Sequence, residues 1–116
     1  LEVDTLDECM LIIPKNIFDS HEFAEYYDTW HLYGVEYCLK MKKIKQKIYV
    51  APVYLWHKSN GVSLNLNYFD AIRKLAQIYR KDVKKIVTFF GIWPTNNILI
   101  NIKCFYRKMR FKVKGI

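Results

Sequence analysis

Residues 86–108 read IVTFFGIWPTNNILINIKCFYRK, and the way this stretch folds decides the architecture of the second half of the chain. Alternating apolar and polar side chains predict one strand over residues 83–92, a turn at Pro94–Asn97 and a second strand from Ile98. One face of the second strand would be apolar, while its other face would carry Asn101, Lys103, Phe105 and Arg107. The stretch therefore predicts a hairpin whose outer face sets an aromatic ring between two cations.

The residues before this hairpin predict two helices and three strands. Apolar side chains at helical spacing indicate a helix over residues 69–82. Alternation with a period of two predicts strands over 34–43, 48–57 and 62–67, with a tight turn at Asn60–Gly61. A capping-box pattern at Asp19 and Glu22 begins another helix, which we expect to extend to residue 31. The predicted order is helix, three strands, helix, two strands.

Without its first helix, this order is β-β-β-α-β-β, which is the order of the OB-fold barrel. The segment WHKSNGVSLNLNYF (56–69) resembles the turn and third strand of the middle subunit of replication protein A and of the telomeric Stn-type subunit. The segment FFGIWPTNNILINIKCF (89–105) is similar to that family's fourth-to-fifth strand hairpin. The family's acidic turn is replaced here by Lys58, Ser59 and Asn60.

The fold class we predict is therefore mainly β, an OB-fold-like barrel with an N-terminal helical extension. The alternative that the same order permits is a two-layer α+β fold, with both helices on one face of an antiparallel sheet. The resemblance implies binding to single-stranded DNA or RNA, or a scaffold role within a hetero-oligomeric genome-maintenance complex, as at telomeres. It also implies a protein partner. The three cysteines show no disulfide pattern and indicate free thiols in a reducing compartment, so we expect a nuclear or cytoplasmic location.

Charge is distributed unevenly along what we expect to be a single domain over residues 1–116. Residues 1–36 carry nine acids and one lysine, a net charge of −8, whereas residues 37–116 carry eighteen cations and two acids, a net charge of +16. The predicted parts are an acidic arm and helix (1–33) and a basic barrel-like body (34–116). Such one-sided charge faces anions or is covered by acids. The basic body could therefore meet nucleic acid, or the charge could serve solubility, with the acidic N-terminal segment as an intramolecular counterweight.

Binding to single strands requires cations for the phosphates and flat rings on which bases stack. The strand pattern places candidates for both on outward faces, and the nucleic-acid-binding set is Tyr54, Trp56, Lys58, Trp93, Lys103, Phe105 and Arg107. The alternative for each ring is packing in the core, since aromatic residues are favoured in strands. We expect Lys103→Glu combined with Arg107→Glu to abolish oligonucleotide binding without unfolding the domain.

A protein-interaction module is the alternative function. In the predicted helix over 20–31, four aromatic residues recur at helical spacing and would share one face. Core packing is the ordinary explanation of such a face, but a partner could also dock there. The partner-binding candidates are Phe23, Tyr26, Tyr27 and Trp30.

The sequence does not favour an enzyme. The basic body holds only Asp70 and Asp82, which argues against a paired-carboxylate or two-metal site. His21-Glu22 lacks the second histidine of an H-E-x-x-H zinc motif, and the three cysteines form no C-x-x-C pair. We therefore expect no catalytic residues, metal or cofactor. No apolar run approaches the ~20 residues that span a bilayer, so we expect no membrane partner.

Overall fold

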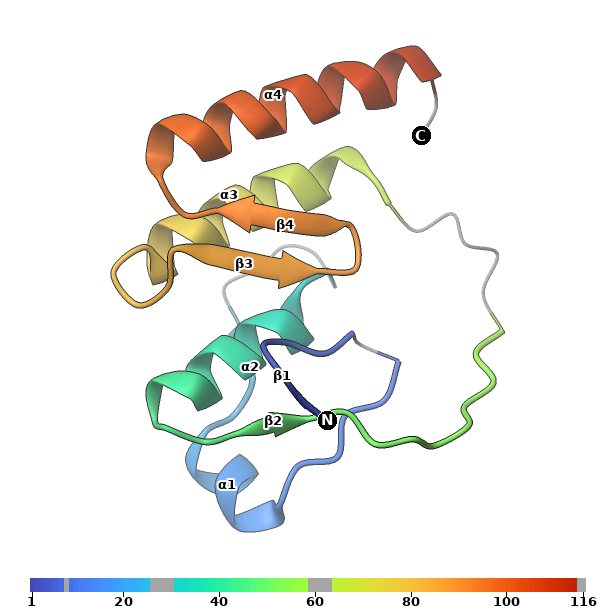
Figure 1. Ribbon diagram of the computed structural model, residues 1–116, viewed down its shortest axis with the longest axis vertical. Helices are drawn as coiled ribbons and strands as arrows, with labels where there is room; N and C mark the ends of the chain where they lie inside the picture. Colours follow the sequence, from blue (N-terminus) through green and yellow to red (C-terminus); the bar gives the residue numbers. More distant parts are fainter. Residues whose placement is uncertain (8, 26–30, 59–63, 115–116) are drawn as a thin grey trace. The chain divides into compact units, whose positions relative to one another are not determined.

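The computed structural model describes residues 1–7, 9–25, 31–58 and 64–114 (Figure 1). Within them the chain is α+β, with four helices and two antiparallel sheets of two strands each. The predicted β-barrel is wrong, because no described strand pairs with more than one other strand and no barrel closes. The two-layer alternative required a larger sheet, which the described residues do not form.

The chain divides into two compact units, residues 1–54 and residues 55–116. The boundary follows Tyr54, twenty-one residues after the predicted boundary between the acidic arm and the basic body. The single-domain organisation stays a prediction.

The first unit contains β1 (Glu2–Val3), α1 (Lys15–Ser20), α2 (Tyr33–Lys43) and β2 (Ile48–Tyr49). The two strands pair antiparallel, with Val3 opposite Ile48. Four buried residues form its core cluster: Tyr37, Cys38, Met41 and Ile48. Partly buried apolar side chains from the first 23 residues pack against that cluster, among them Phe18 and Phe23.

The strand predicted over residues 34–43 is wrong, because this segment lies within α2. In a strand, Glu36 and Cys38 would share the face opposite Val35, Tyr37 and Leu39, but all five are buried. Burial of five consecutive side chains does not fit a strand with one solvated face. The lysines at 40, 42 and 43 lie in the last turn, where they complement the negative end of the helix dipole.

The helix predicted over residues 20–31 also differs from the structure. A shorter helix, α1, ends at Ser20, where the other was expected to begin. Residues 22–25 are not helical. Tyr26, Tyr27 and Trp30 lie outside the described residues.

The second unit contains α3 (Leu66–Tyr79), β3 (Lys85–Thr88), β4 (Gly91–Pro94) and α4 (Asn97–Lys114). The helix expected over 69–82 is observed as α3, beginning three residues earlier. The side chain of Asn65 caps it by accepting a hydrogen bond from the Tyr68 N–H at 3.3 Å. Its buried face includes Phe69, Ile72 and Leu75.

The strand predicted over residues 83–92 folds back on itself as the β3–β4 hairpin. Its turn is formed by Phe89 and Phe90, and Thr88 pairs with Gly91 across it. Gly91 has φ = +122°, a conformation that residues with a Cβ rarely adopt. Glycine at this position therefore permits the tight reversal within a run of β-forming residues.

The strand predicted from Ile98 is wrong, because this segment forms the eighteen-residue helix α4. The predicted turn at 94–97 marks the start of that helix. The Asn96 carboxamide oxygen accepts hydrogen bonds from the N–H groups of Ile98 at 3.0 Å and Leu99 at 3.2 Å. Ile100 and Cys104, one helical turn apart, are buried, whereas Ile98 and Ile102 are exposed. The buried residues of this segment thus recur at the spacing of a helix.

Candidate nucleic-acid interface

The two units differ sharply in charge. Residues 1–54 carry nine acids and six cations, a net charge of −3, while residues 55–116 carry thirteen cations and two acids, a net charge of +11. Together they give the +8 of the whole chain. Asp70, one of the two acids of the second unit, is already paired with Arg73 at 3.1 Å and with Lys108 at 2.7 Å. The second unit is therefore a strongly basic body of 62 residues.

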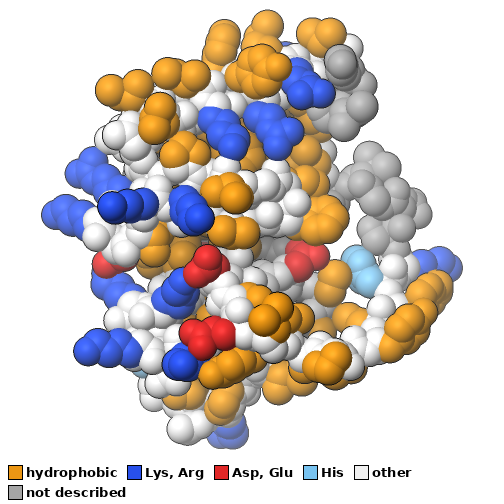
Figure 2. Space-filling model, in the orientation of Figure 1, with side chains coloured by type: hydrophobic (Ala, Val, Ile, Leu, Met, Phe, Trp, Pro, Cys, Tyr) orange, Lys and Arg blue, Asp and Glu red, His pale blue; other side chains and the backbone are white. Residues whose placement is uncertain are grey.

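Four cations gather where the chain leaves α3 and enters β3. We call Arg80, Lys81, Lys84 and Lys85 the cationic turn; all four side chains are exposed. None of the four side chains takes part in a hydrogen bond or ion pair with another described residue. Figure 2 shows Lys and Arg side chains projecting at the left edge of the view, where Figure 1 places the α3–β3 turn. Their charges are available to an external anion.

The backbone of the cationic turn is fixed by hydrogen bonds on both sides. The N–H groups of Asp82 and Val83 donate to the Tyr79 carbonyl at 2.9 and 3.0 Å. Thr95, which is buried, donates its hydroxyl to the Val83 carbonyl at 2.6 Å and its N–H to the Lys84 carbonyl at 3.1 Å. The lysine and arginine side chains thus extend from a fixed segment of backbone.

At the other end of β3, the hairpin tip presents an aromatic ring to solvent. Phe89 is 81 % exposed, while its neighbour Phe90 packs edge-on against Tyr68 with ring centroids 5.1 Å apart. Phe89 lies four residues from Lys85, a span of about 13 Å along an extended strand. The hairpin therefore has cations at one end and a free ring at the other.

Trp93, a predicted binding residue, is completely buried in the second unit. Its ring lies beside those of Tyr68 and Phe69, with centroids 5.8 and 6.1 Å away. Its Nε1–H donates to the Thr88 hydroxyl oxygen at 3.2 Å, and Thr88 donates in turn to the Gly91 carbonyl at 3.0 Å. A ring so enclosed has no face on which a base could stack.

Lys103 and Arg107, predicted to contact phosphates, hold α4 to the hairpin. Lys103 Nζ donates to the Ile92 carbonyl, and Arg107 Nη2 donates to the Phe90 carbonyl at 3.0 Å. Both cations also lie over the Trp93 ring, at 5.2 and 5.9 Å from its centroid. Phe105 does not lie between them, because on a helix it projects from another face, where it is 69 % exposed.

The other predicted nucleic-acid-binding residues lie in the extended segment 50–58, which has no regular structure. Tyr54, at the end of the first unit, is 91 % exposed, and Trp56, near the start of the second, is 74 % exposed. Lys58 is exposed as well. They do not belong to a barrel strand.

Of the predicted partner-binding residues, only Phe23 is described. Its ring packs against those of Tyr33 and Tyr37, at 5.4 and 4.8 Å, and against Phe18 at 5.6 Å. This side chain therefore belongs to the core of the first unit. The other three members of that set lie outside the described residues.

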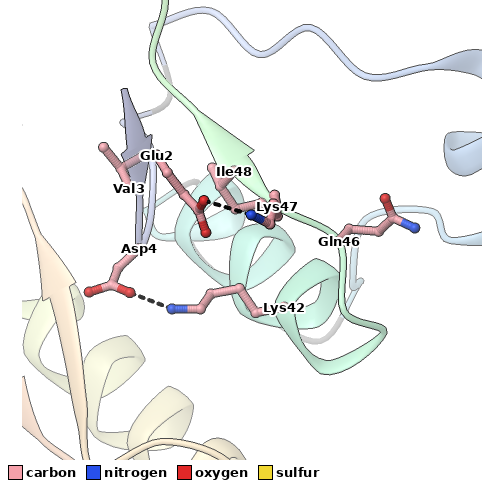
Figure 3. A pocket seen from close by; sticks show the side chains of 7 residues that line it. All are labelled: Glu2, Val3, Asp4, Lys42, Gln46, Lys47 and Ile48. Atoms are coloured by element: carbon pink, nitrogen blue, oxygen red, sulfur yellow. Dashed lines mark hydrogen bonds and ion pairs between the residues drawn. The ribbon is translucent and has the colours of Figure 1, made fainter.

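A shallow pocket of about 400 Å³ lies in the first unit between β1, β2 and the end of α2 (Figure 3). Two ion pairs cross it: Lys47 with Glu2 at 3.1 Å, and Lys42 with Asp4. The hydrogen bond to Glu2, reinforced by its charge, raises the pKa of Lys47. The charged groups of the pocket therefore pair with one another and join β1 to the segment around β2 and α2.

Cysteine and metal chemistry find no support in the described residues. Cys9 is exposed, while Cys38 and Cys104 are buried, and all three are free thiols. Burial raises the pKa of the Cys104 thiol, which keeps it protonated and a poor nucleophile. Burial, together with Cys38, raises the pKa of Tyr37 as well. No group of three metal-ligating side chains occurs among the residues that the structure describes.

Neither the cationic turn nor Phe89 is among the binding residues that the sequence pattern predicts. The run RKDVKK at residues 80–85 packs four cations into six residues and could have been singled out for its charge density. Phe89 could not have been separated from Phe90 without knowing where the hairpin turns.

Comparison with known proteins adds no relative. No protein-family model matches the chain, and no curated protein or solved structure matches it either. The relationship with the replication protein A family thus stays a prediction, although the barrel that it implied is not observed. None of the described helices is both long enough and apolar enough to cross a membrane.

Proposed function

We propose that the second unit binds nucleic acid, with the cationic turn contacting phosphates. The observation that carries this proposal is the group of four exposed cations at 80–85, which have no described acidic partner and extend from a fixed backbone. Unpaired cations held together gain free energy from a polyanion, because each phosphate contact releases condensed counterions. A net charge of +11 on the unit adds long-range attraction.

A single strand is the form of nucleic acid that this surface suits. Phosphate contacts bind without regard to sequence, while exposed rings add stacking that only unpaired bases can provide. Phe89 offers such a ring about 13 Å from Lys85. One short single strand could therefore contact the cationic turn with its phosphates and Phe89 with a base.

The proposal is tested by measuring the binding of a fluorescein-labelled oligothymidylate to the full chain by anisotropy over a series of salt concentrations. Neutralising the turn (Arg80, Lys81, Lys84 and Lys85, each to Gln) removes up to four phosphate contacts. For a single strand, the slope of log K against log salt should then fall in magnitude by about 2.8, four times 0.7. The matched control exchanges Arg80 for Lys and the three lysines for Arg, which keeps every charge and should keep the slope.

The ring is tested separately with Phe89→Ala, for which we expect affinity to fall between about 5-fold and ~150-fold, the range for one stacked base. Phe105→Ala is the control, and its affinity should be unchanged. If the variant with all four cations changed to Gln binds with the same affinity and salt slope as the original chain, the cationic turn is not the binding surface. If Phe89→Ala binds the oligonucleotide as tightly as the original chain, stacking on Phe89 is refuted, while the proposed phosphate contacts still stand.

A further inference from the structure

The helix α4 presents a second apolar face, opposite the one that it buries. Its buried residues include Ile100 and Cys104, while six large apolar residues on the other side are 48 to 78 % exposed. We call these residues the outer stripe: Ile98, Ile102, Phe105, Tyr106, Met109 and Val113. Figure 2 shows the hydrophobic side chains along α4 at the top of the view. An apolar face of this extent on a surface helix marks an interaction site.

The spacing within the outer stripe is that of a seam between helices. Its members form three pairs seven residues apart: Ile98 with Phe105, Ile102 with Met109, and Tyr106 with Val113. From Ile98 to Val113 the stripe runs about 22 Å along the helix. A repeat of seven residues keeps apolar side chains facing a second helix turn after turn. A lipid surface requires no such register.

Charge selects among the possible partners. The helix α4 holds six cations and no acid. Each residue of a helix is rotated by about 100° from the one before it, which places Arg110 and Lys112 on opposite edges of the stripe. Arg110 lies beyond Met109 on one edge and Lys112 beside Phe105 on the other, and both are exposed. A second copy of α4 would bring its own Arg110 and Lys112 to this surface, like charge to like, whereas flanking carboxylates on a partner would pair with them.

We propose that the outer stripe of α4 docks an acidic amphipathic helix of another protein. Apolar side chains of that helix interdigitate with the stripe, and its flanking Glu or Asp residues face Arg110 and Lys112. The cationic turn lies outside this surface, so the proposal is independent of nucleic-acid binding.

The probe is a fluorescein-labelled model peptide of about four heptads, with Ile and Leu at the seam and Glu at both flanking positions. A second peptide carries Lys at the same flanking positions. Binding to the full chain is followed by anisotropy, and we expect the Glu peptide to bind at least ~10-fold more tightly than the Lys peptide. Arg110→Glu combined with Lys112→Glu should reverse that preference.

Substitutions in the stripe complete the test. Ile102→Asp and Phe105→Asp should each weaken the Glu peptide at least ~10-fold. The matched control is Ile78→Asp, the same change at a half-exposed apolar residue of α3, which should leave affinity unchanged. Circular dichroism checks that each variant keeps its helices, as expected for exposed positions.

Four outcomes would overturn the proposal. Binding of neither peptide, or of both equally, would refute the acidic helix as partner. Light scattering that showed a dimer dissociated by Phe105→Asp would assign the stripe to a second copy of the chain. Binding to vesicles of phosphatidylcholine and phosphatidylserine that Phe105→Asp abolishes, without peptide binding, would assign it to a lipid surface.

Discussion

Reversing the charges of Lys103 and Arg107 should destabilise the second unit rather than remove a ligand contact. Each side chain donates a hydrogen bond to a hairpin carbonyl and lies over the buried Trp93 ring. A hydrogen bond contributes about 1–1.5 kcal/mol to the free energy of unfolding, and a cation over an aromatic ring about 0.5–1 kcal/mol. Lys103→Glu with Arg107→Glu therefore costs about 3–5 kcal/mol, and places two carboxylates against carbonyl oxygens.

A loss of this size is measurable by thermal unfolding. For a unit of 62 residues, each kcal/mol lowers Tm by about 4–8 °C. The double variant should thus melt at least ~12 °C below the original chain in far-ultraviolet circular dichroism. Hydrogen exchange should also speed up at the amides of α4, which loses its attachment to the hairpin.

The matched control makes the same charge change on the cationic turn. Lys84→Glu with Lys85→Glu alters two exposed side chains that have no described partner, so the free energy of unfolding should change by no more than about 0.5 kcal/mol per site. This control should instead weaken oligonucleotide binding. Lys103→Gln with Arg107→Gln, which removes the contacts without adding acids, should melt early as well. Unchanged melting of both 103/107 variants would refute the role assigned to these cations.

Three further predictions concern other parts of the chain. Trp93→Ala should destabilise the second unit by about 3–5 kcal/mol, as removal of a buried aromatic ring does, and a denaturant titration would measure the loss. Under native conditions iodoacetamide should modify Cys9 and spare Cys38 and Cys104, because only Cys9 is exposed; rapid modification of Cys104, seen by mass spectrometry, would contradict its burial. Since the pKa of Lys47 is raised in the folded chain, its stabilising contact with Glu2 is fully present below the ordinary lysine value of 10.5 and is lost as pH rises through the folded value. The protection of the Val50 amide, which donates to Leu1, should fall only above that pH once the rate is corrected for base-catalysed intrinsic exchange, and Lys47→Met should abolish this pH-dependent loss of protection.

Local patterns predicted α3 but not the two segments around it. The helix has an apolar face at helical spacing and the cap Asn65, so local and tertiary preferences agree. In NILINIKCF, by contrast, Ile98, Ile100, Ile102 and Cys104 alternate as in a strand, while Ile100 and Cys104 alone fit the buried side of a helix. So short a run fits the spacing of a strand as well as that of a helix, and its β-branched residues favoured the strand, which is wrong.

The same ambiguity affected the candidate site. Charge density was visible in the sequence, but the role of each cation depends on residues distant along the chain. Lys103 lies eleven residues from Ile92, whose carbonyl it contacts, and Arg107 lies seventeen from Phe90. These cations were expected on an outer face only because a strand was predicted there. The segment is a helix, so that placement is wrong.

Composition and neighbouring residues are enough to account for the charge asymmetry, the helix α3 and the lack of a recognisable catalytic motif. Which rings and cations remain free depends instead on the packing of segments that are distant along the chain. Trp93 is enclosed and Phe89 exposed, although both belong to one short hairpin. The physical reason is that a side chain is removed from solvent by whatever packs over it, and for this hairpin those groups come from α3 and α4.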